Sequence, residues 1–161
     1  MILKGKKVYI EDAKNQELNI KGLYATDDFI SLDNIFIEKS IEEMNKPVPR
    51  VYSYFVKENN GNKVIGIISF EIISMMNEYR LGRLHFVADD LTLLIEGLDL
   101  ILEWQILKNN MLKIVVNEGS FEINEVLMHE NFVKTVFKDG KSGYKITKPI
   151  YIERRGDINN G

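Results

Sequence analysis

The chain has 161 residues, of which 45% are hydrophobic and 28% charged, so it is long enough to bury the core of one globular domain. Its formal net charge of −3 and its isoelectric point near 5.5 disfavour nucleic acid or an anionic membrane as the main partner. The sequence contains no cysteine, which excludes disulfides, thiolate metal sites and cysteine nucleophiles.

Targeting and metal-binding signals are also missing from the sequence. Residues 1–12 contain no apolar signal core, and the longest apolar-rich run, residues 91–107, is interrupted by acidic side chains. We therefore expect a cytoplasmic protein without a membrane span. The two histidines, His85 and His129, are far apart and show no HExxH-like spacing, so we expect no metal site.

The N-terminal third predicts one strand and two helices. Residues 6–11 alternate between polar and apolar side chains, which is typical of a strand. Asp12 is a potential N-cap for a helix over residues 13–24, and Asp33 for a second helix that reaches about Asn45. A proline two residues further on ends the second helix, because proline has no amide hydrogen.

The middle of the chain predicts three antiparallel strands. Residues 51–57, 63–74 and 79–87 are rich in β-branched and aromatic side chains. An Asn-Gly pair between the first two indicates a hairpin, since both residues tolerate a positive φ. A second turn, over residues 75–78, connects the second strand to the third.

A long helix and a parallel strand follow. Asp89 or Asp90 offers an N-cap for a helix that reaches about Lys108. The strand over residues 112–116 is apolar enough to be central, and the helical connection should place it parallel to the strand before the helix, by a right-handed crossover. Residues 120–130 predict a short helix.

The C-terminal part predicts a final hairpin that turns at residues 139–143 and runs out through Tyr151. We expect a single domain over residues 1–152 and a disordered tail over residues 153–161. Together the elements predict an α/β (mixed α+β) fold. Its central sheet is mixed but mostly antiparallel, with about seven strands and with helices on both faces.

Three stretches of the sequence carry a resemblance to a known family. Residues 63–72 read KVIGIISFEI, residues 84–87 read LHFV, and residues 112–132 read LKIVVNEGSFEINEVLMHENF. They resemble, in turn, the central hairpin strand, the end of the fourth strand and the last helical motif of the GNAT superfamily of acyl-coenzyme A-dependent N-acyltransferases. The resemblance implies a GNAT-like fold and acetyl-CoA as co-substrate.

The resemblance also implies where the cofactor would bind. In the family, a loop of the form Arg/Gln-x-x-Gly-x-Gly/Ala leads from the fourth strand into the long helix, and its backbone amides bind the pyrophosphate. This chain has Ala-Asp-Asp-Leu-Thr in that place, with neither a glycine nor a basic residue. The positions that carry over as cofactor-binding are Phe86, Val87, Ala88, Leu91, Thr92, Leu93 and Ser120.

The resemblance assigns one backbone amide a role toward the thioester, and the two aspartates would act on the pyrophosphate. The backbone amide near Phe86 to Ala88 would polarise the thioester carbonyl. The carboxylates of Asp89 and Asp90 would complement the dipole of the following helix, and they would repel an incoming pyrophosphate.

The catalytic residues that the family implies are only partly present. The tyrosine that serves members as a general acid falls on Leu127, which cannot donate a proton, and His129 is the nearest titratable replacement. A base for the amine could come from Glu78 or His85 on the fourth strand, or from Glu71 on the third. We carry Glu78, His85 and His129 forward as catalytic candidates.

Two functions remain open from the sequence. The first is an acyl-CoA-dependent N-acetyltransferase that acts on a primary amine of a small molecule, an amino sugar or a peptide. The alternative is a non-catalytic GNAT-like binding or assembly module that has lost acetyl-CoA binding. For either function we expect neither nucleic acid nor membrane as a partner, and a homodimer is possible through an exposed sheet edge.

Overall fold

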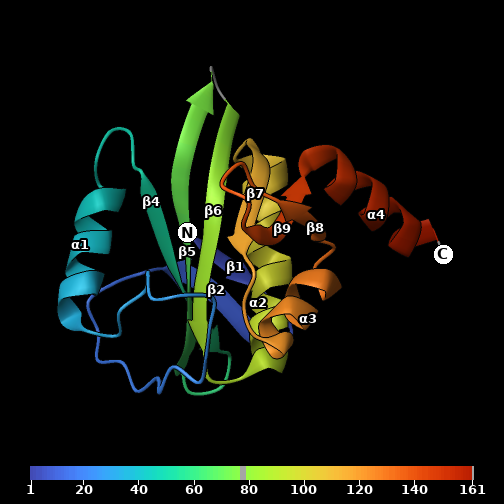
Figure 1. Ribbon diagram of the computed structural model, residues 1–161. Helices are drawn as coiled ribbons and strands as arrows, with labels where there is room; N and C mark the ends of the chain where they lie inside the picture. The colour runs from blue at the N-terminus through green and yellow to red at the C-terminus, as the bar shows by residue number, and fades with distance from the viewer. Residues whose placement is uncertain (77–78, 161) are drawn as a thin grey trace.

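The computed structural model describes the backbone of residues 1–76 and 79–160 and forms one mixed sheet with helices on both faces (Figure 1). The strands are β1 (Ile2–Lys4), β2 (Val8–Asp12), β3 (Tyr24–Ala25), β4 (Val51–Glu58), β5 (Val64–Met76), β6 (Tyr79–Ala88), β7 (Met111–Asn117), β8 (Val133–Val136) and β9 (Ser142–Thr147). Their order in the sheet is β1-β2-β4-β5-β6-β7-β9-β8, and β3 pairs with β6 off this path. The predicted mixed fold is confirmed, with β1 and β3 as strands that the sequence did not predict.

Four helices complete the described part of the chain. They are α1 (Asn34–Met44), α2 (Leu91–Glu103), which continues into a π-helical turn η1 (Trp104–Lys108), α3 (Phe121–His129) and α4 (Lys148–Asn160). In Figure 1, α1 lies on one side of the strands, and α2, α3 and α4 lie together on the other. Among the residues described, no helix combines the length and the apolarity needed to cross a bilayer.

One pair of neighbouring strands in the described sheet is parallel, and it separates part of the way along. β6 pairs with β7 from Arg80 to Arg83, whereas β7 continues beside β9 as far as Asn117. The other edge of β6 pairs with β5 over its whole length. Beyond Arg83, the edge of β6 that faces β7 is therefore not paired with β7. The parallel pairing of the two strands agrees with the predicted helical crossover between them.

The two faces of the sheet bury separate groups of apolar side chains. The alternation of side chains along β6 sends Phe86 into the larger core under α2 and α3, and Val87 into the smaller core under α1. Buried Ile37 of α1 belongs to the smaller core, as do Ile20 and Ile30 from the long connection between β2 and α1. That connection therefore covers part of the sheet as a helix would.

Glycines allow two close approaches in the larger core. A Cβ on Gly97 of α2 would lie 3.0 and 3.1 Å from the two Cγ atoms of Val56, so α2 packs almost directly on the sheet. A Cβ on Gly82 of β6 would lie 2.7 Å from the Sδ atom of Met111, which is fully buried at the start of β7. At both positions a side chain would require neighbouring atoms to shift.

The helix predicted over residues 13–24 is wrong. This stretch forms no helix, and its last residue begins β3. The backbone amides of Lys21, Gly22 and Leu23 donate to the carboxylate of Asp89 instead of to carbonyls one helical turn earlier. Gly22 also has a φ of +79°, which stops a right-handed helix. A tertiary contact thus decides the local structure.

The prediction of a last strand that runs through Tyr151 is also wrong. β9 ends at Thr147, whose Oγ1 accepts a hydrogen bond from the amide of Ile150, and α4 begins at the next residue. Proline fits the first turn of a helix, because an amide hydrogen there would have no helical partner. α4 runs on to Asn160, through the stretch predicted as a disordered tail. Of the turn predicted at residues 75–78, positions 77 and 78 lie outside the described residues.

Replacing Gly97 by alanine should test how closely α2 packs on the sheet. Alanine is favoured over glycine in a helix by roughly 1 kcal/mol, but overpacking of a core costs roughly 1–3 kcal/mol. We expect Gly97→Ala to lower the free energy of unfolding by about 1 kcal/mol in urea titrations. Thr92→Ala, at an exposed position of the same helix, is the control and should not destabilise. Stabilisation by Gly97→Ala would contradict the packing described.

Candidate functional site

The connection from β6 to α2 consists of two aspartates. β6 ends at Ala88 and α2 begins at Leu91. Asp90 is the N-cap: its side chain accepts a hydrogen bond from the amide of Leu93 at 2.9 Å, and its carbonyl accepts one from the amide of Leu94 at 3.0 Å. One of the amides that could meet a phosphate at this helix start is therefore taken by a carboxylate.

Asp89 does not cap α2, because its carboxylate turns toward the connection between β2 and α1. It accepts hydrogen bonds from the amides of Lys21 and Gly22, each at 2.8 Å, and from that of Leu23 at 3.3 Å. Burial alone would raise the pKa of Asp89, but the three amides outweigh burial and lower the pKa below its ordinary value. The ionised carboxylate of Asp89 thus holds the connection between β2 and α1 against the end of β6 through three hydrogen bonds.

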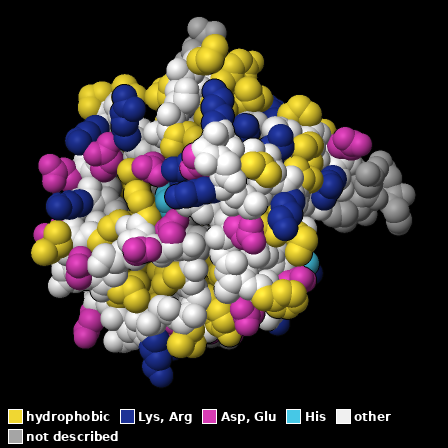
Figure 2. Space-filling view, viewed as in Figure 1, with side chains coloured by type: hydrophobic (Ala, Val, Ile, Leu, Met, Phe, Trp, Pro, Cys, Tyr) yellow, Lys and Arg dark blue, Asp and Glu magenta, His cyan; other side chains and the backbone are white. Residues whose placement is uncertain are grey.

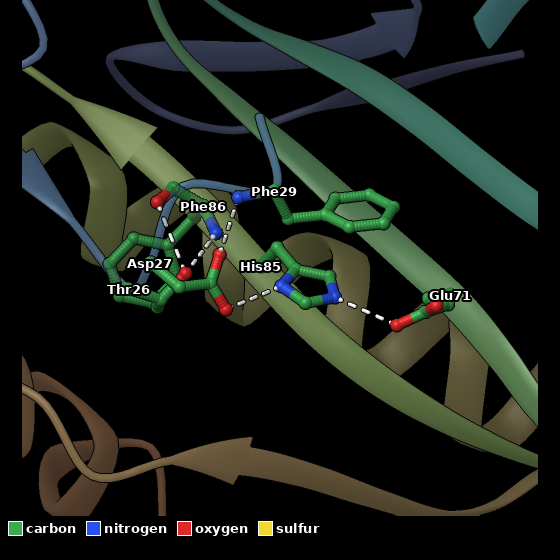
Figure 3. A network of polar contacts seen from close by, with 6 residues as sticks. All are labelled: Thr26, Asp27, Phe29, Glu71, His85 and Phe86. Atoms are coloured by element: carbon green, nitrogen blue, oxygen red, sulfur yellow. Dashed lines mark hydrogen bonds and ion pairs between the residues drawn. The ribbon is translucent and has the colours of Figure 1, made fainter. Parts of the chain in front are cut away.

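We call residues 20–29 the strap, because they lie across the open edge of β6. Within the strap, β3 pairs antiparallel with Val87 and Ala88. The amide of Thr26 donates to the carbonyl of Phe86 at 3.0 Å, and the amide of Phe86 donates to Oγ1 of Thr26 at the same distance (Figure 3). The strap therefore occupies the backbone groups that the sequence assigned to a cofactor.

A second contact between the strap and β6 involves His85, the residue before Phe86 (Figure 3). Its Nδ1 lies 2.7 Å from Oδ2 of Asp27 in the strap, and its Nε2 lies 3.2 Å from Oε1 of Glu71 on β5. The ring of Phe29 stacks on the imidazole with centroids 4.0 Å apart. His85 is only 3% exposed. The sequence identified His85 and Glu71 but gave no indication of Asp27 or Phe29.

The charges around His85 hold it in place. Burial would raise the pKa of Asp27, but hydrogen bonds from His85 and from the amide of Phe29, with Arg83 nearby, lower that pKa below its ordinary value. Both nitrogens of His85 face carboxylate oxygens, Nδ1 that of Asp27 and Nε2 that of Glu71. With the strap in place, both ring nitrogens of His85 are therefore occupied by contacts within the chain.

The remaining catalytic candidates do not contact the group formed by Asp27, His85 and Glu71, which we call the Asp27–His85–Glu71 centre. Glu78 lies outside the described residues. His129 is on the last turn of α3, with its side chain 62% exposed, and lines a pocket between α2, α3 and α4 that His85 does not reach. Leu127, in the place of the family tyrosine, is fully buried in the larger core. The structure thus places the two histidines in different sites.

The positions carried over as cofactor-binding do not fit acyl-CoA in this conformation. The edge of β6 at Phe86, Val87 and Ala88 is paired with the strap. At the helix start, Leu93 is bonded to Asp90 while Thr92 is exposed, and Oγ of Ser120 accepts from the amide of Ile123 as the N-cap of α3. No group of three or more His, Cys, Asp or Glu side chains suited to a metal ion occurs among the described residues.

Comparison with solved structures establishes the fold as that of GNAT acetyltransferases. No protein-family model and no curated protein sequence matches the chain. Apo FdhC, a nucleotide-linked sugar GNAT, superposes with a TM-score of 0.69 at 13% identity, covering 99% of this chain and 97% of its own. A GNAT-family acetyltransferase from Bacillus anthracis gives a TM-score of 0.66 at 12% identity, over 92% of this chain and 99% of its own.

A third solved structure is the Salmonella typhimurium acetyltransferase that modifies the N-terminal serine of a ribosomal subunit protein. It superposes with a TM-score of 0.67 at 11% identity, over 91% of this chain and 99% of its own. These three structures match along almost the whole chain, and at 11–13% identity they show the fold alone. A fold does not determine a function, so the function must be argued from the residues of the site.

Removing the carboxylate of Asp89 should loosen the strap. Asp89→Ala leaves three backbone amides without their acceptor. A hydrogen bond to a charged group contributes roughly 1.5–3 kcal/mol net, but two of these three bonds are exposed, so water can take the place of the carboxylate there. We expect the free energy of unfolding to fall by roughly 1–3 kcal/mol. Hydrogen exchange should become faster at the amides of residues 21–26. Asp28→Ala, an exposed aspartate of the same strap, is the matched control. Equal effects of the two variants would show that Asp89 does not fasten the strap.

Proposed function

We propose that this protein is a GNAT-fold binding module that does not take up acyl-CoA while the strap lies against β6. The observation that carries this proposal is the pairing of β3 with Val87 and Ala88, together with the two hydrogen bonds between Thr26 and Phe86. A pantetheine arm along this edge and the strap would compete for the same backbone donors and acceptors.

The strength of the strap supports the proposal. Release breaks the three bonds to Asp89, the two between Thr26 and Phe86, and the contact between Asp27 and His85. A neutral hydrogen bond contributes roughly 0.5–1.5 kcal/mol and one to a charged group roughly 1.5–3 kcal/mol. Even a release cost of about 4 kcal/mol, which is less than the sum of these contributions, would weaken cofactor affinity by roughly a thousandfold.

The short connection between β6 and α2 supports the proposal independently. Two residues cannot form the glycine-containing loop that surrounds a pyrophosphate, and both residues here are aspartates. Repulsion between each carboxylate and an incoming pyrophosphate would be on the order of a few kcal/mol before screening, at an effective dielectric near 20. On the face drawn in Figure 2, acidic and basic side chains are interspersed, and no large basic patch for a polyanion is seen.

An acyl-CoA-dependent N-acetyltransferase is the second candidate, and the Asp27–His85–Glu71 centre favours it. A histidine between two carboxylates beside the open edge of a GNAT sheet could accept a proton from an amine once Asp27 had left with the strap. The neighbours suggest a nucleotide-linked sugar or the N-terminal amine of a peptide as the acceptor. This candidate requires the strap to be released before catalysis.

Thermal unfolding with acetyl-CoA separates the two candidates. A ligand at about a hundred times its dissociation constant adds about 2.7 kcal/mol of stability. We expect no shift of the melting temperature of the native chain in 2 mM acetyl-CoA, and no acetylated product by mass spectrometry with an amino sugar or a serine-initiated peptide. A clear shift in the native chain would overturn the proposal.

A variant with a weakened strap shows which element excludes the cofactor. Thr26→Val keeps the shape of the side chain and removes the acceptor of the Phe86 amide. If the double variant Thr26→Val with Asp89→Ala gains a shift that the native chain lacks, the strap is what excludes acetyl-CoA, and the second candidate becomes a gated enzyme. If neither chain shifts, the short connection between β6 and α2 is sufficient to exclude it.

A further inference from the structure

The hairpin of β5 and β6 projects beyond the rest of the sheet (Figure 1). β4 accompanies β5 as far as Ile72, whose amide donates to the carbonyl of Arg50 at 2.7 Å. On the other side, β7 pairs with β6 only from Arg80 onward. We call residues 73–76 of β5, together with Tyr79 of β6, the arm. Among the described residues, no strand pairs with residues 73–76 on the side of β4, so the arm has an open edge.

The side chains of the arm are apolar and exposed. The exposed fractions are 43% for Ile73, 45% for Met75, 72% for Met76 and 50% for Tyr79. Figure 2 shows hydrophobic side chains gathered at the top of the view, where the hairpin of Figure 1 ends. Single apolar side chains are normal on a surface, but a group of them on one projecting ribbon marks a site of association.

The open edge of the arm is also free of charge. Residues 73–76 read ISMM. Arg80 lies opposite Met75 in the register of the two strands, but the carbon of its guanidinium lies 5.3 Å from the ring centroid of Tyr52 on β4, and its Nη1 is buried. This contact directs the cation toward β4 and away from the end of the hairpin.

The two outer strands of the sheet differ from the arm in this respect. β1 carries Lys4 and β8 carries Lys134, and both lysines are exposed. A lysine on an edge strand discourages pairing with another chain, because the pairing would bury its charge. The arm has no such protection. Its register shift lies between Ile72 and Ser74, so residues 74–76 beyond the shift remain suited to pairing.

A second copy of the chain fits this edge better than an unrelated peptide. Two identical antiparallel strands present the same donors and acceptors to each other, so a two-fold axis satisfies both edges at once. No charge on residues 73–76 opposes an identical segment, and none is present to select a charged partner. A ribbon of two strands is also only marginally stable in water, and pairing with a second ribbon would stabilise it.

We propose that two copies of this chain associate through the arm, with residues 74–76 of one β5 pairing antiparallel with the same residues of the other. The exposed side chains of both arms then pack together away from water. The contact is small beside the roughly 800 Å² that each partner buries in a standard interface. We therefore expect a reversible dimer with a dissociation constant on the order of 10–100 µM. The arm and the strap lie at opposite ends of β6, so the inference does not depend on the function proposed above.

Sedimentation velocity over chain concentrations that span this dissociation constant tests the proposal. We expect the mean mass to rise from 18.7 kDa, the mass of one chain, toward twice that value and no further. Met75→Lys with Met76→Lys should weaken association by at least tenfold, because pairing would bury the added charges. A native chain that stays monomeric at about ten times the upper expected dissociation constant would overturn the proposal.

A matched pair of substitutions controls for charge and for the other edges. Ile2→Lys with Val136→Lys adds the same charge at exposed positions of β1 and β8, and it should leave association unchanged. All four positions are exposed, so thermal unfolding should show that both double variants are folded. If the two double variants weaken association equally, or if only the control weakens it, the arm is not the interface.

Cross-linking locates the contact directly. The chain has no cysteine, so a single introduced thiol reports on its own surroundings. Residues opposite each other in an antiparallel pair have Cβ atoms about 4.5–5.5 Å apart, close to the separation in a disulfide. With oxidised glutathione as the oxidant, Met75→Cys or Met76→Cys should form a disulfide-linked dimer, and Val136→Cys should not. The absence of cross-links in both arm variants would overturn the proposal even if the native chain dimerises.

Discussion

Hydrogen bonding along one edge of β6 is the constraint on which the site depends. β7 stops pairing with β6 after Arg83, yet the last five residues of β6 are all buried. Backbone donors and acceptors in such a segment cannot be left without partners, because each would cost roughly 1–3 kcal/mol. The edge must therefore be satisfied by another segment of the chain or by a ligand. In this molecule β3 and Thr26 satisfy it.

The two-residue connection after β6 and the presence of the strap are linked through one residue. Asp89 sits where the sequence of a typical family member would open into a loop, and its carboxylate gathers three backbone amides of the strap. The arrangement resembles an anion bound by consecutive amides, except that the anion belongs to the protein. The aspartate that follows β6, where a glycine-containing loop would begin, thus also holds the strap in place.

The sequence predicted those elements whose signals are local. β4, β5 and β6 have continuous β-branched and aromatic runs, and α2 and β7 have the length and apolarity of a central helix and strand. The order of these elements was enough to predict the fold. β3 was not predicted because two residues have no periodicity, and because its partners on β6 lie more than 60 residues away.

The same limit applies to the site. Sequence reasoning placed His85 and the amides of residues 86–88 at the end of the fourth predicted strand, and the structure has them at the end of β6. It could not show that Asp27 contacts the imidazole, because an Asp-Asp pair in an irregular segment reads as solvent-exposed. Nor did it distinguish Asp89 from Asp90. These adjacent aspartates differ in role only because one side chain meets the helix and the other meets the strap.

Gly82 and Met111 meet where β6 and β7 begin to run parallel, and their closeness has an evolutionary consequence. A Cβ at position 82 would lie only 2.7 Å from the sulfur of Met111, so a side chain at position 82 requires the buried Met111 side chain to shift or to be smaller. Homologues that carry a side chain at position 82 should therefore have a smaller residue at position 111. This pair is expected to covary, and its covariation would record where the two strands are pressed together before they diverge.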